Sequence, residues 1–205
     1  MKRPLPSAAL TLSLLCGLGL PPVLRAEGQP NGSASAEAPE PEIKVSPVSN
    51  KAGRAEGVVE APLDAVLKVV EDYGGYEKFM PHFRASRVLS SRGKSALVYM
   101  QASIAKDTMT LWAQLKITPK PNEGKKQVIE AKMVQGNMDA MFARWELTPV
   151  DSTHTMVAFQ LLMDPKVPLP ASFVQSENEK ATQKTIRALR RVVAERASLA
   201  TNDKH

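Results

Sequence analysis

The sequence has little of the chemistry on which catalytic and disulfide-stabilised proteins usually depend. Its 205 residues include one cysteine and three histidines, and aromatic residues make up 5% of the chain. The single cysteine, Cys16, lies in an apolar stretch near the N-terminus. An intrachain disulfide and a metal site built from several thiolates are therefore excluded, and the fold must be stabilised by a packed core.

The histidines are poorly spaced for metal binding. His82 and His154 lie far apart in the sequence, His205 is the last residue, and no HxH or HxxxH pattern occurs. The sequence also lacks a GxSxG nucleophile motif and a glycine-rich phosphate loop. We therefore predict no metal, no cofactor and no catalytic residue. His82 follows Pro81 in a predicted loop, where we favour an ordinary surface residue over a residue near a cavity mouth.

A carboxylate is the remaining candidate for acid–base chemistry. Glu130 lies in a predicted strand over 127–134, between Ile129 and Ala131. Because alternate residues of a strand face opposite sides, Glu130 shares the more polar side with Lys132. We expect it to point outward and to pair across strands with a lysine.

The first 26 residues have the layout of a secretory signal peptide. Lys2 and Arg3 form a basic start, residues 8–20 are almost entirely apolar, and Ala26 offers a small residue at the cleavage point. The apolar stretch is short for a membrane span. We therefore expect a periplasmic or secreted protein.

Lipid attachment at Cys16 is the competing interpretation of this segment. Leu14 and Leu15 precede the cysteine, where lipoprotein signals favour small residues, and apolar residues follow it. We do not expect lipoprotein anchoring.

The charge balance gives no sign of a nucleic-acid partner. Of the 27 lysines and arginines, Lys2, Arg3 and Arg25 would leave with the signal peptide, so 24 remain against 21 aspartates and glutamates. Such a mildly basic surface does not favour binding to a phosphate backbone.

Composition divides the rest of the chain into three parts. Residues 27–53 are rich in Pro, Ser, Ala, Glu and Gly and predict a disordered linker. Residues 54–198 predict one folded domain, and 199–205 form a tail.

Within the domain, the hydrophobic period changes from helical to alternating and back to helical. Two short helices follow a first strand, and strands separated by short turns come next. The predicted elements are a strand over 55–60, helices over 62–72 and 76–80, and strands over 86–90, 96–103, 108–119, 127–134, 140–149 and 155–163.

The last predicted element is a long helix over 173–198. Ser172 and Gln175 form a capping box at its start, and no Pro or Gly interrupts it. It is the only element long enough to cover the apolar face of the sheet. The fold class is therefore α+β, with an antiparallel sheet wrapped around a long C-terminal helix.

Several local strings carry a family resemblance. They are Val59-Glu60-Ala61-Pro62 running into Ala65-Val66 and Val69, Asp72-Tyr73, the segment Tyr76-Glu77-Lys78-Phe79-Met80-Pro81, and Pro168-Leu169-Pro170 before the last helix. The segment around Tyr76 is similar to a D-x-x-x-Y-x-x-F-M-P motif. Over 54–198 the chain resembles the START-like (SRPBCC) helix-grip superfamily, of the polyketide cyclase and coenzyme Q-binding type. The resemblance implies a helix-grip fold, with functions in that superfamily ranging from binding to cyclisation.

The C-terminal helix changes character along its length. Its second half places Ile186, Leu189, Val192 and Val193 on one face, whereas the first half has small and polar residues there. Small polar side chains above an apolar sheet would leave a void. We predict a cavity in which three residues act as polar handles for a largely apolar ligand: Asn178, Thr182 and Thr185.

The opposite wall of this cavity is predicted from the inward strand positions and the residues near the entrance. Flexible methionines suit an adaptable apolar pocket. The predicted wall residues are Met109, Leu111, Met133, Trp145, Phe159 and Leu161, with Phe79, Met80 and Phe83 near the entrance. Trp112 is out of phase with its apolar neighbours and, with the basic helix face, points to transient membrane contact.

These observations favour an exported protein that binds a hydrophobic small molecule such as a lipid, a quinone or a polyketide-like compound. Two alternatives stay open. One is a cyclase- or hydrolase-like enzyme that uses the same cavity, and the other is an interaction module with a filled core.

Overall fold

An antiparallel sheet of eight strands and one long helix account for most of the structure, a computed structural model that describes residues 40–47, 51–104, 109–122 and 124–202. The predicted signal peptide lies outside the described residues, as does most of the predicted linker. The described residues all belong to a single compact unit, Pro39–His205.

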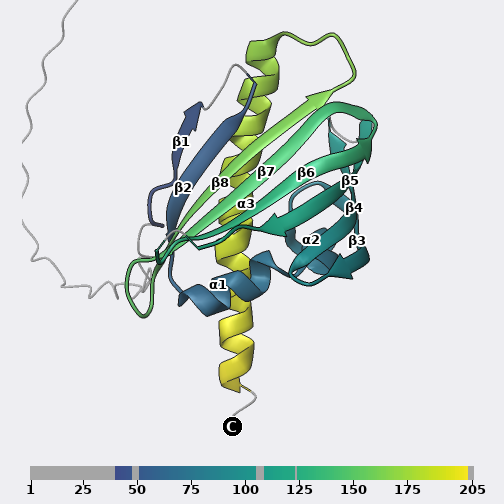
Figure 1. Cartoon of the computed structure of the whole chain (residues 1–205). Helices are drawn as coiled ribbons and strands as arrows, with labels where there is room; N and C mark the ends of the chain where they lie inside the picture. Colours follow the sequence, from purple (N-terminus) through teal and green to yellow (C-terminus); the bar gives the residue numbers. More distant parts are fainter. Residues whose placement is uncertain (1–39, 48–50, 105–108, 123, 203–205) are drawn as a thin grey trace, which may run out of the picture. The chain divides into compact units, whose positions relative to one another are not determined.

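The elements follow one another in the order strand, strand, helices, six strands, helix (Figure 1). Their bounds are β1 (Lys44–Pro47), β2 (Gly53–Val59), α1 (Leu63–Val70), the 3-10 turn η1 (Tyr73–Gly75), α2 (Tyr76–Phe79), β3 (Phe83–Arg92), β4 (Ser95–Ile104), β5 (Met109–Pro119), β6 (Gln127–Gly136), β7 (Met138–Pro149), β8 (Thr155–Pro165) and α3 (Ala171–Asn202). Every helix and strand predicted between 55 and 198 is present, with ends that differ by a few residues.

The sheet is antiparallel throughout, in the order β1-β2-β8-β7-β6-β5-β4-β3. The short turns predicted between strands produce the run of neighbours from β3 to β8. The second strand, β2, then pairs with the last strand, β8, from Gly53 opposite Leu161 to Val59 opposite Thr155. The α+β helix-grip class predicted from the sequence is confirmed.

One part of the linker prediction is wrong. Residues 44–47 form strand β1, which pairs with β2 in the register Lys44 to Glu56, and the side chain of Ile43 packs against the core. Arg190 of α3 adds a further tie, because its Nη1 donates to the carbonyl of Pro41 at 2.7 Å. The segment is polar and short, so composition alone does not reveal that a neighbouring strand edge is available to it.

Helix α1 begins and packs as its sequence indicates. Pro62 is the N-cap rather than the first helical residue, and Asp64 lies in the first turn, where a negative charge stabilises the helix dipole. Val66, Val69 and Val70 are buried. The helix therefore closes one end of the core.

Helix α3 packs along β2 and β8 on one face of the sheet, while β3, β4 and β5 curve round on the side of α2 (Figure 1). Gly53 allows this close packing, because a Cβ at that position would lie 2.5 Å from the backbone nitrogen of Glu179. The second half of α3 is packed tightly, with Ile186 and Leu189 at 0% and 1% exposure. Its first half is where space is left.

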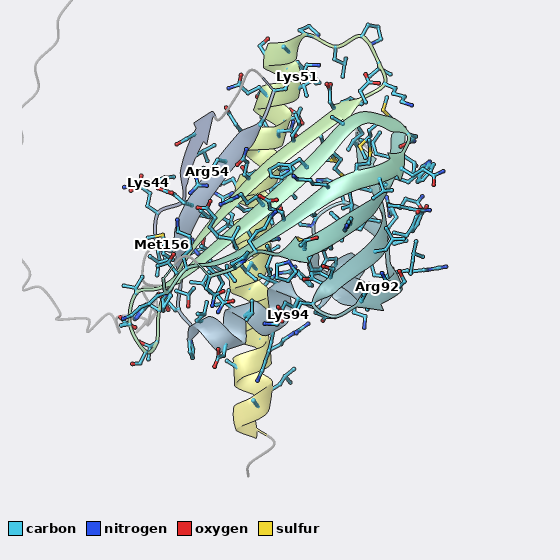
Figure 2. All side chains as sticks on the ribbon, in the orientation of Figure 1. Lys44, Lys51, Arg54, Arg92, Lys94 and Met156 are labelled. Atoms are coloured by element: carbon cyan, nitrogen blue, oxygen red, sulfur yellow. The ribbon has the colours of Figure 1, made fainter. Side chains whose placement is uncertain are left out.

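The outer face of the sheet carries a chain of ion pairs. Arg54 of β2, labelled in Figure 2, lies 3.0 Å from Glu146, which Arg144 also contacts at 2.9 Å. Arg144 reaches Glu130 at 2.8 Å, and Lys120 binds the other oxygen of Glu130 at 3.0 Å. The predicted pairing of Glu130 with a lysine is confirmed, and its carboxylate is directed away from the cavity side.

Candidate functional site

A cavity of about 720 Å³ lies between the sheet and α3. This volume falls within the range that holds small organic ligands, roughly 300–1,000 Å³. The cavity forms because α3 rests mainly on β2 and β8, whereas the shorter α1 and α2 contact β7 and β3, so the middle of the curved sheet is left uncovered by α3. The cavity predicted from the change in helix character is present, and the interface between sheet and helix is not filled.

The wall of the cavity is largely apolar. Six of the chain's nine methionines line it: Met80, Met100, Met109, Met138, Met141 and Met163. Trp145 and Phe159 form an aromatic floor, with ring centroids 4.2 Å apart. Because methionine side chains are flexible and polarisable, this wall can adapt to ligands of different shape.

The structure places nine of the twelve residues predicted for the site on the cavity wall. These are Met80, Phe83, Met109, Leu111, Trp145, Phe159, Leu161, Asn178 and Thr185. Their placement follows from the alternation of the strands and from the position of the α2–β3 turn. No ligand is present, so their roles in binding stay predictions.

Three predicted site residues lie elsewhere. Phe79 is buried in the core, with its ring 5.5 Å from that of Tyr76. Met133 is near the end of β6, where its sulfur lies close to Gly136. Thr182 is completely buried, and its hydroxyl donates to the carbonyl of Glu179 at 2.7 Å.

Asn178 lines the cavity, but the protein itself uses its amide. Its Nδ2 donates to the carbonyl of Lys51 at 2.8 Å and to that of Met163 at 3.1 Å, and the Met163 N–H donates to Oδ1 at 3.1 Å. Strand β2 begins at Gly53, opposite Leu161, so Met163 of β8 lies beyond the paired part of β2. The Asn178 amide therefore makes the hydrogen bonds that a neighbouring strand would otherwise make, and so joins α3 to the sheet (Figure 2, where Lys51 is labelled beside α3). It is not a free polar group for a ligand.

The cavity-facing residues of α3 were predicted only in part. Asn178 and Thr185 line the cavity as predicted, and Val174 and Ala181, which were not predicted, line it as well. The predicted Thr182 is instead fully buried, with its hydroxyl bonded to its own helix. Gly53, where α3 comes close to the sheet, was a signal for this tight packing, since a glycine at a strand end often marks where another backbone comes near.

The polar groups on the wall are few. The Tyr76 hydroxyl donates to the carbonyl of Val70 at 2.5 Å. Burial raises the pKa of Tyr76, with a smaller contribution from Tyr73. Burial likewise raises the pKa of Tyr73 to about 12, with a smaller contribution from the Glu71 charge. Both phenols are therefore neutral at physiological pH and present hydrogen-bonding groups rather than charges.

The charged residues gather at the mouth. His82 of the α2–β3 turn and Glu177, Lys180 and Lys184 of α3 line the cavity where it opens to solvent, and all four are exposed. His82 has a positive φ of 66°. His82 is exposed, as expected from the sequence, but it also lines the cavity, which is the position that the sequence analysis favoured less.

Trp112, which the sequence places out of phase with its apolar neighbours, is half-buried. Its ring stacks on that of Tyr99 of β4, with ring centroids 6.1 Å apart.

Within the described residues, no group of three or more His, Cys, Asp and Glu side chains is placed to hold a metal ion. In the same part of the chain, no helix combines the length and the apolarity needed to cross a bilayer.

Comparison with protein families gives one match over most of the domain. A family model described as polyketide cyclase / dehydrase and lipid transport matches residues 59–190. No curated protein matches the sequence.

Comparison with solved structures gives many similar folds. A START superfamily protein from Mycobacterium smegmatis has a TM-score of 0.63 at 17% identity, covering 70% of this chain and 97% of its own. A STAR-related lipid transfer protein from Xanthomonas axonopodis has a TM-score of 0.64 at 20% identity, covering 74% and 93%. The Zhui aromatase/cyclase from Streptomyces has a TM-score of 0.51 at 15% identity, covering 77% and 94%. At these identities the likeness establishes the START-like helix-grip fold.

Proposed function

The chain belongs to the polyketide cyclase / dehydrase and lipid transport family, and from this premise we propose that it binds a hydrophobic small molecule in the cavity between the sheet and α3. The observation that carries the proposal is the cavity itself, about 720 Å³ of space with a methionine-rich wall. An apolar space of this size is stabilised when a ligand fills it, because the wall regains contacts that a void lacks.

The driving force is burial of apolar surface. Each methylene group moved from water into the cavity contributes about 0.8 kcal/mol. Association opposes this with a cost of at least about 4 kcal/mol in lost translational and rotational freedom. A ligand therefore needs a sizeable apolar part, and a wall with few hydrogen-bonding groups selects by size and shape more than by polar pattern.

A matched pair of variants on α3 tests this function. Ala181 lines the cavity, whereas Ala194 on the same helix is exposed and lies outside the wall. Ala181→Leu should weaken the binding of an apolar fluorescent probe, because the larger side chain occupies ligand space. For the same reason, higher concentrations of lipids or quinones should be needed to displace the probe. Ala194→Leu should leave both unchanged. Equal binding by the two variants would refute the assignment of the cavity as the site.

An incubation experiment with the same variants separates ligand carriage from catalysis. A panel of linear polyketide-like substrates incubated with the protein should be recovered unchanged if the protein only binds them. Product formation that Ala181→Leu abolishes would instead assign the cyclase-type activity named in the family description.

We extend the proposal to the cell envelope. The support is the sequence of the first 26 residues, with Lys2 and Arg3 before an apolar stretch and Ala26 at the expected cleavage point. Two large apolar side chains beside the mouth, Leu169 at 39% exposure and Phe173 at 52%, suit transient contact with a lipid surface while a ligand enters or leaves. An N-terminus beginning at Glu27 in the protein isolated from its own cells would support export, and an intact Met1 would count against it.

A further inference from the structure

The mouth of the cavity holds two basic side chains that the fold brings together without an acidic partner. His82 comes from the turn after α2 and Lys184 from α3, and the Lys184 Nζ lies 3.5 Å from the His82 Nε2. Among the described residues, no carboxylate lies within ion-pair distance of Lys184. The neighbouring Lys180 differs, because it pairs with Glu177 at 2.8 Å. The mouth therefore has one unneutralised lysine beside a basic ring.

The backbone at His82 is held in an unfavourable conformation. Its φ of 66° lies in the left-handed region, which a residue with a Cβ seldom adopts. The carbonyl of His82 accepts a hydrogen bond from the Ser103 N–H at 2.9 Å, which fixes the turn to β4. The ring is thus presented to Lys184 by a strained and anchored turn, an arrangement that occurs more often at functional sites than elsewhere.

A hydroxyl on the cavity wall follows Lys184 in the chain. Thr185 lines the cavity, and the residue as a whole is only 8% exposed. Its hydroxyl makes no hydrogen bond to another described residue, whereas the Thr182 hydroxyl is bonded to its own helix. The Thr185 hydroxyl is also not among the fully buried unpartnered atoms of the described residues. It is therefore accessible from the cavity and free to bond to a ligand atom.

We propose that the ligand is a single-chain amphiphile with an anionic head group, a carboxylate or a phosphate, whose apolar tail fills the cavity. The head group accepts hydrogen bonds from the Lys184 ammonium and the Thr185 hydroxyl, with the His82 ring beside it. The tail extends along the methionine-lined wall. This inference rests on the proposed function, because it assigns a chemical class to the ligand of the same cavity.

The order of groups along the cavity supports this orientation. The charged residues lie only at the mouth, and the floor is formed by Trp145 and Phe159. A charge placed on the floor would lose its hydration without gaining an ionic partner. At the mouth the same charge keeps part of its water and gains a charge-assisted hydrogen bond.

The test compares ligands that share one tail. Laurate, dodecyl phosphate and 1-dodecanol are titrated into the full mature protein by calorimetry, with the two anions below their micelle concentrations and 1-dodecanol below its solubility limit. We expect laurate or dodecyl phosphate to bind about tenfold more tightly than 1-dodecanol, the effect of one charge-assisted hydrogen bond. The stronger of the two anions identifies the head group.

Two variants of α3 localise the effect. Lys184→Met keeps the aliphatic stem and removes the charge, and it should abolish the preference for the anions over 1-dodecanol. Arg187→Met removes a charge from an exposed position outside the cavity wall and should change neither. His82→Asn introduces a residue that tolerates the left-handed backbone at this position. It should reduce the preference for the anions by a smaller factor than Lys184→Met does.

The outcomes separate the two proposals. If 1-dodecanol binds as tightly as both anions, or if Lys184→Met and Arg187→Met weaken anion binding equally, the anionic head-group assignment is wrong and apolar ligand binding stands. If none of the three compounds binds, both proposals fail.

Discussion

The amide of Asn178 offers the sharpest test of how α3 is attached to the sheet. The substitution Asn178→Leu removes a side chain that makes three hydrogen bonds, to the Lys51 carbonyl and to both backbone groups of Met163, at 2.8–3.1 Å. Asn178 is 2% exposed, so water cannot readily replace these bonds. The leucine would remove the amide partner of three backbone groups in a site with little access to solvent.

The expected magnitude follows from the number of bonds. A hydrogen bond of this kind contributes about 1 kcal/mol net, and a buried group left unsatisfied costs about 1–3 kcal/mol. The gain from burying the larger apolar side chain offsets part of this loss. We therefore expect the free energy of unfolding to fall by roughly 3–4 kcal/mol, which lowers Tm by about 6–16 °C for a domain of this size.

Urea denaturation followed by tryptophan fluorescence measures this change, with Trp145 as a buried reporter. The midpoint should fall while the m-value stays constant, since the surface exposed on unfolding is unchanged. Thr185→Val is the matched control, because it alters a cavity-lining polar residue of the same helix whose hydroxyl makes no bond to another described residue, and it should change stability by less than about 1 kcal/mol. Unaltered or increased stability of Asn178→Leu would refute the structural role and restore Asn178 as a ligand handle.

Three further outcomes are expected from the outer face, the buried phenol and the mouth. Glu130→Gln should lower stability by about 1 kcal/mol at neutral pH. Burial raises the pKa of Glu130, but the hydrogen bonds and charges of the neighbouring cations outweigh burial and lower the pKa from 4.5. The stabilisation that the ionised carboxylate provides is therefore present above pH 4.5 and is lost as the pH falls below it. In urea titrations at acid pH, the difference in unfolding free energy between Glu130→Gln and the wild type should vanish. Burial, and then the Glu71 charge, raises the pKa of Tyr73 from 10 to about 12. The contribution of the neutral phenol to the free energy of unfolding is therefore complete below pH 10 and is lost as the pH rises through 12. Phenolate absorbance that appears at pH 10 for every tyrosine would contradict this. Phe173→Ser should weaken co-sedimentation with lipid vesicles about tenfold. Leu199→Ser, which changes an exposed residue at the far end of α3, should leave co-sedimentation unaltered. If both variants lose equally, the mouth is not the site of membrane contact.

Much of the fold could be predicted because its elements obey simple periods. Strand β5 alternates regularly, with Leu111, Ala113 and Leu115 buried, while Trp112 and Gln114 between them are only half-buried. The terminal helix has no Pro or Gly to interrupt it, so its length was evident. The predicted capping box at Ser172 is wrong, because the helix already begins at Ala171 and the Gln175 amide donates to Glu179 instead. Strand β1 was missed because its pairing depends on a neighbouring edge and on the Arg190 bond to the Pro41 carbonyl, neither of which appears in local composition.

The cavity was predictable in outline but not in its polar detail. A helix half with small and polar residues indicated unfilled space, and the strand alternation indicated most of the wall. The hydrogen bonds of Asn178 and Thr182 were beyond reach, because both depend on where β2 ends and on the approach of α3 at Gly53. A short polar side chain at an inward position fits both a ligand contact and an internal bond, and only the three-dimensional arrangement separates the two.

The mouth illustrates the same limit. His82 and Lys184 are far apart in the sequence, and each alone resembles an ordinary surface residue. Their proximity depends on the left-handed turn at His82, a conformation that no residue pattern announces at a histidine. The basic pair therefore emerges only from the fold.

Native mass spectrometry of the protein purified from the cells that make it tests the central claim most directly. We expect a population that carries one additional small-molecule mass, which organic extraction removes and identifies as a hydrophobic compound, and which is absent from the Ala181→Leu variant. A single mass equal to that of the bare polypeptide, together with no thermal stabilisation by a panel of lipids, quinones and fatty acids, would contradict the assignment of this cavity as a ligand-binding site.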